Sequence, residues 1–281
     1  MLRIQKISSF DAPELRPYAT MRRPVEHEVQ GIFVAEGEKV VRRLLESHFT
    51  VVSAVFTEKH LEEFRPLIEA RPEPVVIYLA GKKWLETLTG FSMFQGVLAV
   101  GKIPAHVSLE DILRHSPKPR LLAAVDGLTN SENLGALVRN CAAFRVQALL
   151  VGETSSSPFL RRAVRNSMGA IFQLPVVEIG KGTGDVARTT LAQTLRLLRE
   201  RNVRCVAAHP RGTKHLSRAD FIQDCCIVFG SEGDGISPEV LESCDELVSI
   251  PMPDKIDSLN VGAAAAVFLY EANRQRKNTA L

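Results

Sequence analysis

The chain has 281 residues, of which 45% are hydrophobic and 24% are charged, a composition that supplies enough apolar side chains for the cores of one or two domains. No apolar run approaches the roughly 18–20 residues that cross a bilayer, so no membrane span is expected. The first ten residues lack the long apolar core of a signal peptide. The formal net charge of +3 is compatible with a nucleic-acid partner but does not demonstrate one.

The N-terminal part of the chain has the pattern of a small α/β domain. Residues 1–25 are polar and are expected to form an arm or an edge segment. After them, strand-like and helix-like apolar patterns alternate, and we assign residues 1–104 to a first domain. The expected elements are a strand from Gly31, a helix after Gly37, a strand at 51–56, a helix at 61–70, a strand at 75–79, a helix through Trp84 and a strand at 95–100.

Residues 105–119 are expected to be a linker, because prolines are frequent there and only one short stretch is helical in character. A second domain is then expected over 120–281. It begins with a strand at 121–125 that ends at Asp126.

The helix after this strand has one clear apolar face. The face is formed by residues at spacings i, i+3, i+4 and i+7, which are Leu134, Leu137, Val138 and Cys141. Arg139 lies about 140° around the helix from Leu134 and so leaves the apolar face. By position alone it is a solvated surface arginine.

Arg161, Arg162 and Arg165 lie close together on a helix that is expected to start at Ser157 and Pro158. Such a cluster either contacts RNA phosphates or forms an ordinary solvated helix face. The residues alone do not decide between these two interpretations.

The five cysteines show no C-x-x-C spacing, and four of them lie in apolar runs. They are expected to be small core residues of a reduced, cytoplasmic protein. No metal site is expected.

The stretch 226–271 concentrates strand ends, loops and helix starts. An apolar run at 226–229 predicts a buried strand, and GSEGDGIS follows at 230–237. The glycine order differs from that of dinucleotide-binding loops and P-loops, so this loop either lets a ligand approach the backbone or is plain turn chemistry. A second strand at 247–250 stops at Pro251. In open α/β sheets, ligands bind beside such strand ends.

The last helix is expected at 259–270, with Ser258 as its N-cap. Its residues are apolar almost all round, and such a helix must be buried on more than one side. We therefore predict that one side packs on the sheet and that the other joins a second copy in a homodimer.

Three motifs occur in order along residues 120–273, and together they resemble those of the SpoU (TrmH) family of RNA ribose 2′-O-methyltransferases. Asn130 and Ser131 stand where many members have Asp-Pro, and Arg145 stands where most have glycine. The matched residues are Asp126, Asn133, Gly135 and Arg139 in the first motif, GSEGDGIS and IPMP (250–253) in the second, and SLNVGAAAA (258–266) in the third.

This resemblance implies a SPOUT-type fold, in which a parallel α/β sheet carries a C-terminal trefoil knot. It also implies a homodimer and, for residues 1–104, a small α/β substrate-binding domain similar to a ribosomal protein. The expected function is S-adenosylmethionine-dependent methylation of a ribose 2′-hydroxyl in structured RNA, either ribosomal or transfer RNA.

The resemblance further implies that S-adenosylmethionine is bound mainly by backbone groups at Gly230, Ile250 and Leu259, and we add Ala208 and Met252 to this set. A glycine loop beside an apolar slot suits a neutral heterocycle.

Arg139 is expected to act in catalysis. A guanidinium is effectively always protonated, so we interpret Arg139 as a group that binds a phosphate and stabilises charge on the 2′-oxygen. Glu232 is expected to orient Arg139 through a charge-assisted pair. Asn133, Ser258 and Asn260 are expected to hold the ribose or the motif loops, although Asn133 and Ser258 are also good N-cap residues.

Two other functional classes stay open. One is a non-catalytic RNA-binding protein that retains the knotted fold. The other is a nucleotide-binding α/β enzyme of unrelated chemistry, for which the fingerprint loops are absent. Binding of S-adenosylmethionine, but not NAD or ATP, separates the expected function from the second class.

Overall fold

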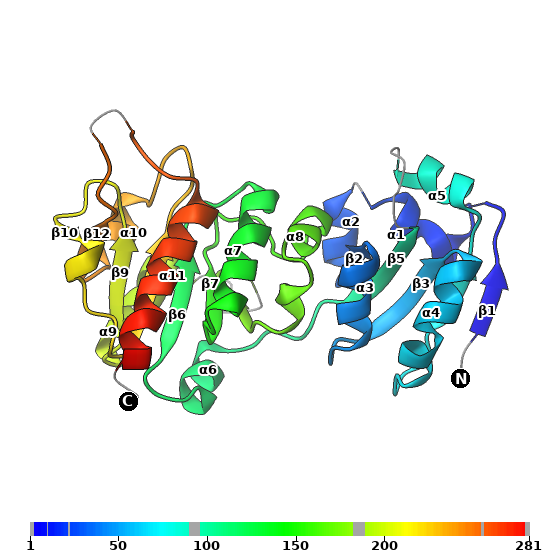
Figure 1. The fold of residues 1–281 in the computed structure, drawn as a ribbon, viewed down its shortest axis with the longest axis horizontal. Coiled ribbons are helices and arrows are strands. Elements are labelled where there is room, and N and C mark those ends of the chain that lie inside the picture. The colour runs from blue at the N-terminus through cyan, green and yellow to red at the C-terminus, as the bar shows by residue number, and fades with distance from the viewer. Residues whose placement is uncertain are drawn as a thin grey trace. The chain divides into compact units, whose positions relative to one another are not determined.

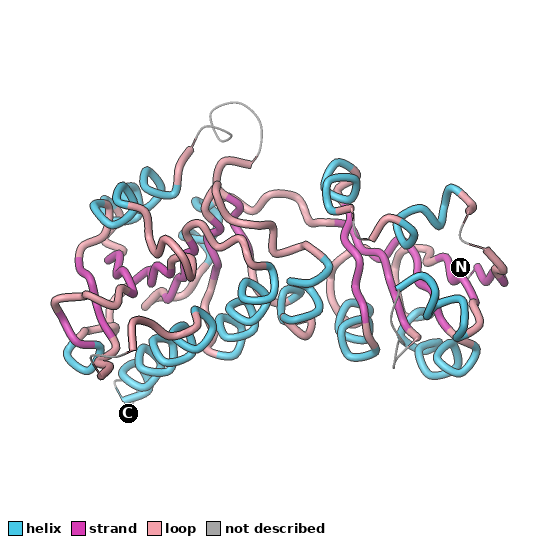
Figure 2. Tube along the Cα trace, turned by 90° about the horizontal axis from the view of Figure 1, so that it is seen from above, coloured by secondary structure: helices cyan, strands magenta, loops and turns pink. Residues whose placement is uncertain are grey.

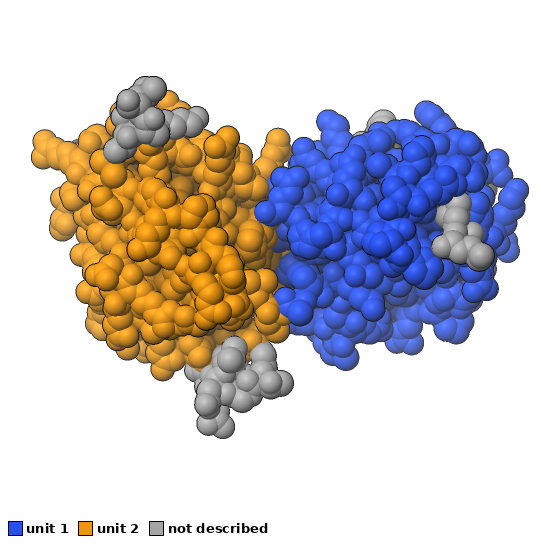
Figure 3. All heavy atoms as spheres, turned by 90° about the horizontal axis from the view of Figure 1, so that it is seen from below, with its two compact units in different colours: residues 1–105, 159–173 blue, residues 106–158, 174–281 orange. Residues whose placement is uncertain are grey.

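The computed structural model describes residues 3–9, 11–21, 23–89, 96–181, 189–253 and 256–278. The chain divides into two compact units (Figure 1, Figure 3). Unit 1 comprises residues 1–105 and 159–173, and unit 2 comprises residues 106–158 and 174–281. The segment 159–173, which the sequence analysis assigned to the second domain, therefore belongs to unit 1.

Unit 1 is built on a mixed five-stranded sheet with the order β1-β4-β3-β5-β2. Strands β1, β4 and β3 are parallel, whereas β5 is antiparallel to both β3 and β2. The expected alternation of strands and helices is confirmed, although residue 95 lies outside the described residues. The elements are β1 (Arg3–Lys6), η1 (Pro13–Leu15), α1 (Arg16–Ala19), α2 (Pro24–Val29), β2 (Ile32–Glu36), α3 (Glu38–Leu45), β3 (Val51–Phe56), α4 (Glu58–Glu69), β4 (Val76–Leu79), α5 (Lys82–Thr89) and β5 (Val97–Lys102).

The first residues of the chain belong to the sheet and core of unit 1. Strand β1 pairs with β4 at the edge of the sheet. Of the two alternatives expected for residues 1–25, an arm or an edge segment, the edge segment is therefore confirmed. Leu15, Tyr18 and Met21 are buried. The Tyr18 hydroxyl also forms a hydrogen bond of 2.8 Å with Ser53 Oγ on β3, so the buried phenol has a polar partner.

The segment 159–173 joins unit 1 through an aromatic cluster. It contains α8 (Arg161–Asn166) and η2 (Ala170–Phe172). The rings of Phe159 and Phe172 lie 5.8 and 5.6 Å from that of Phe33 on β2, and Phe172 also lies 5.3 Å from Phe49. Burial of four aromatic rings explains why this segment packs with residues that precede it by more than a hundred positions.

Unit 2 is built on a seven-stranded sheet with the order β10-β12-β9-β11-β6-β7-β8, in which every strand pair is parallel. Helices lie on both sides of the strands (Figure 2), and the central strands are accordingly continuous apolar runs. The predicted parallel α/β sheet is confirmed. Its elements are α6 (Leu109–His115), β6 (Leu121–Val125), α7 (Ser131–Ala143), β7 (Ala148–Val151), β8 (Val176–Glu178), α9 (Leu191–Glu200), β9 (Arg204–Ala208), β10 (Lys214–His215), η4 (Leu216–Arg218), β11 (Cys225–Phe229), α10 (Pro238–Glu242), β12 (Glu246–Ser249) and α11 (Val261–Asn278).

Most of the expected linker is part of unit 2. Helix α6 is capped by Ser108, whose side chain accepts a hydrogen bond from Asp111 N. Ile112 and Leu113 on this helix are buried in the core of unit 2. Proline frequency therefore misidentified a packed helix as a connecting segment.

Helix α11 begins later and ends later than the sequence indicated. Asn260, and not Ser258, caps it, because Asn260 Oδ1 accepts hydrogen bonds from Gly262 N at 2.9 Å and Ala263 N at 3.4 Å. The helix lies along α7, where Asn140 Nδ2 donates to Gly262 O at 2.6 Å. One face of α11 is thus buried within the same chain.

Candidate active site

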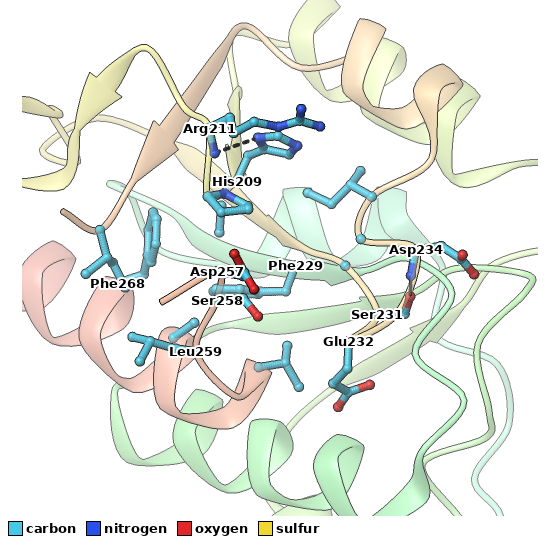
Figure 4. Close-up of a pocket in the computed structure, with 18 of the residues that line it drawn as sticks. His209, Arg211, Phe229, Ser231, Glu232, Asp234, Asp257, Ser258, Leu259 and Phe268 are labelled. Atoms are coloured by element: carbon cyan, nitrogen blue, oxygen red, sulfur yellow. Dashed lines mark hydrogen bonds between the residues drawn. The ribbon is translucent and has the colours of Figure 1, made fainter. Parts of the chain in front are cut away.

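A cavity of about 370 Å³ lies in unit 2, at the carboxyl ends of β9, β11 and β12 and beside the start of α11. This is the edge of a parallel sheet at which ligands usually bind. All five residues expected to bind the cofactor line it, and so do Glu232 and Ser258 (Figure 4). The five are Ala208, Gly230, Ile250, Met252 and Leu259.

One part of the cavity wall is apolar. Phe229 and Phe268 are almost fully buried, and their rings form a T-shaped pair with centroids 5.9 Å apart. Val248 and Val261 extend this apolar part. It suits a flat heterocycle, whereas Arg211, Asp234 and Asp257 line the cavity elsewhere and offer charged groups.

The glycine loop folds back on itself at the rim of the cavity. Ser231 N donates to Gly235 O at 3.0 Å, and Gly235 has a φ of +72°. A Cβ on Gly230 would lie 2.2 Å from the carbonyl carbon of Gly235. Gly230 is therefore required by the close approach of two backbone segments, whether or not a ligand is bound.

Asp126 anchors the end of this loop. Its carboxylate is buried and accepts a hydrogen bond of 2.7 Å from Ser237 N. The first and second motifs are thus joined through β6 and the residue that precedes α10.

A chain of side-chain hydrogen bonds connects all three motifs. Asn260 Nδ2 donates to Asn133 Oδ1 at 3.0 Å, and Asn133 Nδ2 donates to a carboxylate oxygen of Glu232. Each amide uses both its donor and its acceptor in a defined direction. Three residues from distant parts of the sequence are therefore held in one geometry.

Asn133 does not cap its helix, because Asn130 does. The Asn130 side chain accepts hydrogen bonds from Glu132 N at 2.9 Å and Asn133 N at 3.2 Å. The capping alternative for Asn133 is therefore wrong. Since the capping position of α11 belongs to Asn260, Ser258 lies before the helix and lines the cavity.

Arg139 is exposed on α7, as its position around the helix indicated. It does not line the cavity. Within the part of the chain that the structure describes, its guanidinium forms no ion pair with Glu232, whose carboxylate is bonded to Asn133 instead. The expectation that Glu232 orients Arg139 is corrected accordingly.

Two of the three clustered arginines have a carboxylate partner in unit 1. Arg161 forms an ion pair with Glu36, and Arg165 Nη1 lies 3.0 Å from Glu36 Oε1. Glu36 is buried, whereas 61% of the Arg165 side chain is exposed. Arg162 is also exposed, so Arg162 and Arg165 present positive charge to solvent.

His209 and Arg211 were missed by the sequence analysis, although both line the cavity. His209 Nδ1 accepts a hydrogen bond of 3.1 Å from Arg211 N, which assigns the proton of the neutral ring to Nε2. Burial and the nearby Arg211 guanidinium lower the pKa of His209. Its place directly after Ala208, at the end of β9, was the available signal.

The cysteines are free and, except for the half-buried Cys244, buried. Burial raises the pKa of Cys205 and Cys226, as expected for core thiols. Among the described residues, no group of three or more His, Cys, Asp or Glu side chains has the arrangement of a metal site. Over the same residues, no helix combines the length and the apolar character needed to cross a bilayer.

The model of the SpoU rRNA methylase family matches residues 120–270. The 23S rRNA (guanosine-2′-O-)-methyltransferase RlmB of Photorhabdus laumondii is 34% identical over 248 residues, which are 86% of this chain and 98% of that protein. The RlmB of Escherichia coli is 33% identical over 246 residues, which are 85% and 97% of the two chains.

Solved structures with the same fold cover nearly the whole chain. The AdoMet-bound rRNA methyltransferase of Sinorhizobium meliloti matches 96% of this chain and 98% of its own, with a TM-score of 0.79 and 23% identity. An RNA 2′-O ribose methyltransferase matches 97% of this chain and 100% of its own, with a TM-score of 0.77 and 26% identity. From the family match and the sequence relatives, we conclude that the chain belongs to the SpoU rRNA methylase family.

Proposed function

We propose that this protein is an S-adenosylmethionine-dependent methyltransferase that methylates the ribose 2′-hydroxyl of a guanosine in 23S rRNA. The observation that carries the proposal is a cavity with an apolar wall suited to a nucleoside, which lies directly beside the hydrogen-bonded chain of Asn260, Asn133 and Glu232. The names of the relatives, which share about a third of their residues with this chain, support the choice of RNA.

The cavity fits the cofactor in size and chemistry. Its volume of about 370 Å³ lies within the usual range for small-molecule sites. Gly230 exposes backbone at the rim, and Ile250, Met252 and Leu259 supply apolar contacts, with Ala208 beside them. When bound, S-adenosylmethionine supplies a methyl group that is already activated by the positive charge on sulfur.

Glu232 is the side chain best suited to hold the 2′-hydroxyl. One of its oxygens accepts from Asn133, and the other, which has no partner among the described residues, can accept the hydroxyl hydrogen. Because Asn133 is itself fixed by Asn260, the carboxylate does not need to reorganise when the ribose arrives. Ser258 lines the same cavity and offers a further hydrogen bond to the ribose.

Arg139 acts on the RNA in this proposal. Its exposed side chain is available to bind the phosphate next to the reacting ribose and to stabilise negative charge on the 2′-oxygen. A permanently charged guanidinium does not act as the base.

Unit 1 is the substrate-binding part of the protein and adopts the ribosomal-protein-like fold that the sequence motifs implied. Arg162 and Arg165 present positive charge on α8, which supports contacts with RNA phosphates. The buried thiols of unit 2 and a ribosomal RNA substrate are consistent with a protein of the cytoplasm.

The protein forms a homodimer through α11. Val267 and Tyr270 are 40% and 59% exposed, and Ala263 is exposed on the same side of the helix. A stripe of this kind on a helix that otherwise packs inside its own chain supports a second copy as the occupant. Sedimentation should give a dimer for the wild type and a monomer for Tyr270→Glu. A monomeric wild type at micromolar concentration would exclude this assembly.

The C-terminal segment threads through the connection between β9 and β11 in a trefoil knot. Strand β11 lies between β9 and β6 in the sheet, so the chain returns to the middle of the sheet after building its edge. The end of α11 then contacts this connection, where Gln275 Nε2 donates to Ala219 O at 2.9 Å and Arg276 Nε donates to Phe221 O at 2.8 Å.

The test is methylation of an unmodified 23S rRNA transcript with labelled cofactor, with unmodified transfer RNA as the comparison. The expected product carries the methyl group on a guanosine ribose, so the linkage that follows it should resist alkali. A methyl group on a base would contradict the proposal. Cofactor binding without transfer to any RNA would favour the non-catalytic alternative.

A further inference from the structure

A second cavity, of about 330 Å³, lies in unit 1 and is lined by residues from α3, the turn that follows it and η2. It is separate from the cofactor cavity, and no motif of the family includes its residues. The lining residues are Arg43, Glu46, Ser47, His48, Phe172 and Gln173.

The turn after α3 is fixed by hydrogen bonds from the Arg71 guanidinium. Arg71, whose side chain is only 7% exposed, donates to Leu45 O at 2.9 Å and Phe49 O at 2.6 Å, and also to Ser47 O. Glu73 pairs with the same guanidinium at 2.6 Å. A buried, neutralised arginine that binds the carbonyls of residues 45, 47 and 49 fixes the backbone that carries His48.

The His48 ring is exposed and packs against Phe49, with centroids 4.9 Å apart. Phe49 is buried in the aromatic cluster of unit 1. The imidazole is thus supported by Phe49, and His48 lines the cavity. Flat side chains held in this way are the usual platforms on which RNA bases stack.

Arg43 is also fixed in place. Its Nη1 donates to Met168 O at 2.6 Å, and its aliphatic carbons lie 3.0 Å from the position of a Cβ on Gly169. The remaining N–H groups of the guanidinium are available to a ligand. Within the described residues, the side chains of Glu46, His48 and Gln173 have no hydrogen-bond partner.

The mixture of charges identifies the kind of ligand. Glu46 repels a phosphate, so a cavity that contains both Glu46 and Arg43 is poorly suited to the RNA backbone. A nucleobase with adjacent donor and acceptor groups, above all guanine, satisfies a carboxylate, a guanidinium and the Gln173 amide together. We propose that this cavity binds an unpaired guanine of the RNA substrate, stacked on His48. The inference rests on the proposed function, because it makes unit 1 a reader of RNA sequence as well as of charge.

The test measures binding of an unmodified 23S rRNA transcript to the full chain. His48→Ala should weaken binding about tenfold, within the range found for loss of one stacked base, without a change in the salt dependence. Glu46→Gln separates the alternatives most sharply. Loss of a guanine acceptor weakens binding, whereas loss of a charge that merely repels RNA strengthens it.

Arg65→Ala is the matched control. Arg65 is a partly exposed arginine of unit 1 that pairs with Glu62 on α4 and lies outside the cavity. Its loss should leave binding of the transcript nearly unchanged, because Arg65 does not line the cavity. Wild-type binding by both His48→Ala and Glu46→Gln, or tighter binding by Glu46→Gln, would overturn the proposal.

Two further measurements keep the outcomes distinct. The affinity for S-adenosylmethionine should be unchanged in His48→Ala and Glu46→Gln. A wild-type protein that does not methylate 23S rRNA would refute the proposed function but not the binding site in unit 1.

Discussion

Asn260 has two roles that a single substitution separates. Its Oδ1 caps α11 through Gly262 N and Ala263 N, whereas its Nδ2 donates to Asn133 Oδ1 at 3.0 Å. Asn260→Asp keeps an oxygen for the cap and removes the amide donor. Since asparagine and aspartate cap helices about equally well, the free energy of unfolding should change by less than about 0.5 kcal/mol.

The same substitution disrupts the chain of hydrogen bonds to Glu232. The new carboxylate oxygen faces Asn133 Oδ1, and two acceptors repel each other. If the Asn133 amide rotates by half a turn to relieve this contact, its oxygen faces the Glu232 carboxylate instead. One link is lost in either orientation, and a misplacement of about 1 Å at a reacting group costs roughly 10²-fold in rate.

The assay combines urea unfolding with single-turnover methyl transfer to the 23S rRNA transcript. Asn260→Asp should lose about 10²-fold in rate with nearly unchanged stability, whereas Asn260→Ala should also lose about 1 kcal/mol of stability. Adding Asn133→Ala to Asn260→Asp should cost little more, because the two residues act as a unit. A wild-type rate for Asn260→Asp would refute the role of the hydrogen-bonded chain.

Three further predictions follow from single residues. Arg139→Ala should change the free energy of unfolding by less than about 0.5 kcal/mol and reduce the methyl-transfer rate about 10²–10³-fold, with cofactor affinity retained. Arg139→Lys should restore little of this rate, and full activity of Arg139→Ala would exclude a catalytic role for Arg139. Gly230→Ala should destabilise the protein by about 1–3 kcal/mol and weaken cofactor binding, because the new Cβ would collide with backbone atoms. Gly233→Ala is the control: its Cβ has open space around it, so its thermal unfolding should match that of the wild type. The pKa of His209 is lowered in the folded state, so the unfolded state binds more protons as pH falls below 6.5, and the free energy of unfolding decreases there. His209→Gln should show a smaller decrease in this free energy between pH 7 and 5. The same pH dependence in the variant and the wild type would contradict the lowered pKa of His209.

The location of the cavity in unit 2 was predictable because its signals are local. Apolar runs that end at Gly230 and Pro251 mark two strand ends, and parallel strands bring their carboxyl ends to one edge of a sheet. Gly230 and Ile250 were therefore expected at the same edge once both strands joined one sheet, and both line the cavity, as does Leu259.

The partner of Glu232 was not predictable from these signals. Charge favoured Arg139, but the side of α7 that meets the glycine loop depends on how α11 packs against it. A Cβ on Gly262 would lie 3.3 Å from Ala136 Cβ, so the two helices approach closely. At the start of α11, Asn260 donates to Asn133, and Asn133 in turn donates to Glu232. The contact between Asn133 and Glu232 forms only in the tertiary structure, so the apolar periodicity of one helix does not predict it.

The arginine cluster of α8 shows the same limit for electrostatics. A run of three arginines indicates a surface for anions when only neighbouring residues are considered. Glu36, the carboxylate that neutralises part of this charge, lies 125 positions from Arg161, at the end of β2. The ion pair forms because an aromatic cluster packs the segment 159–173 against unit 1. The charged residues of the sequence do not predict this packing of aromatic rings.

The position of Glu232 depends, through these contacts, on a helix that is anchored at both ends. At its start, α11 is fixed by the Asn260 cap and by Asn140, which donates to Gly262 O. At its end, Arg276 donates to the carbonyl oxygens of residues 119, 120, 221 and 223, each at 2.8 Å. Aspartate, which caps helices about equally well, would supply an acceptor for α11 but no donor for Asn133. In the proposed function, Asn260 therefore serves both stability and catalysis, but through different atoms: Oδ1 caps α11 and Nδ2 holds Asn133.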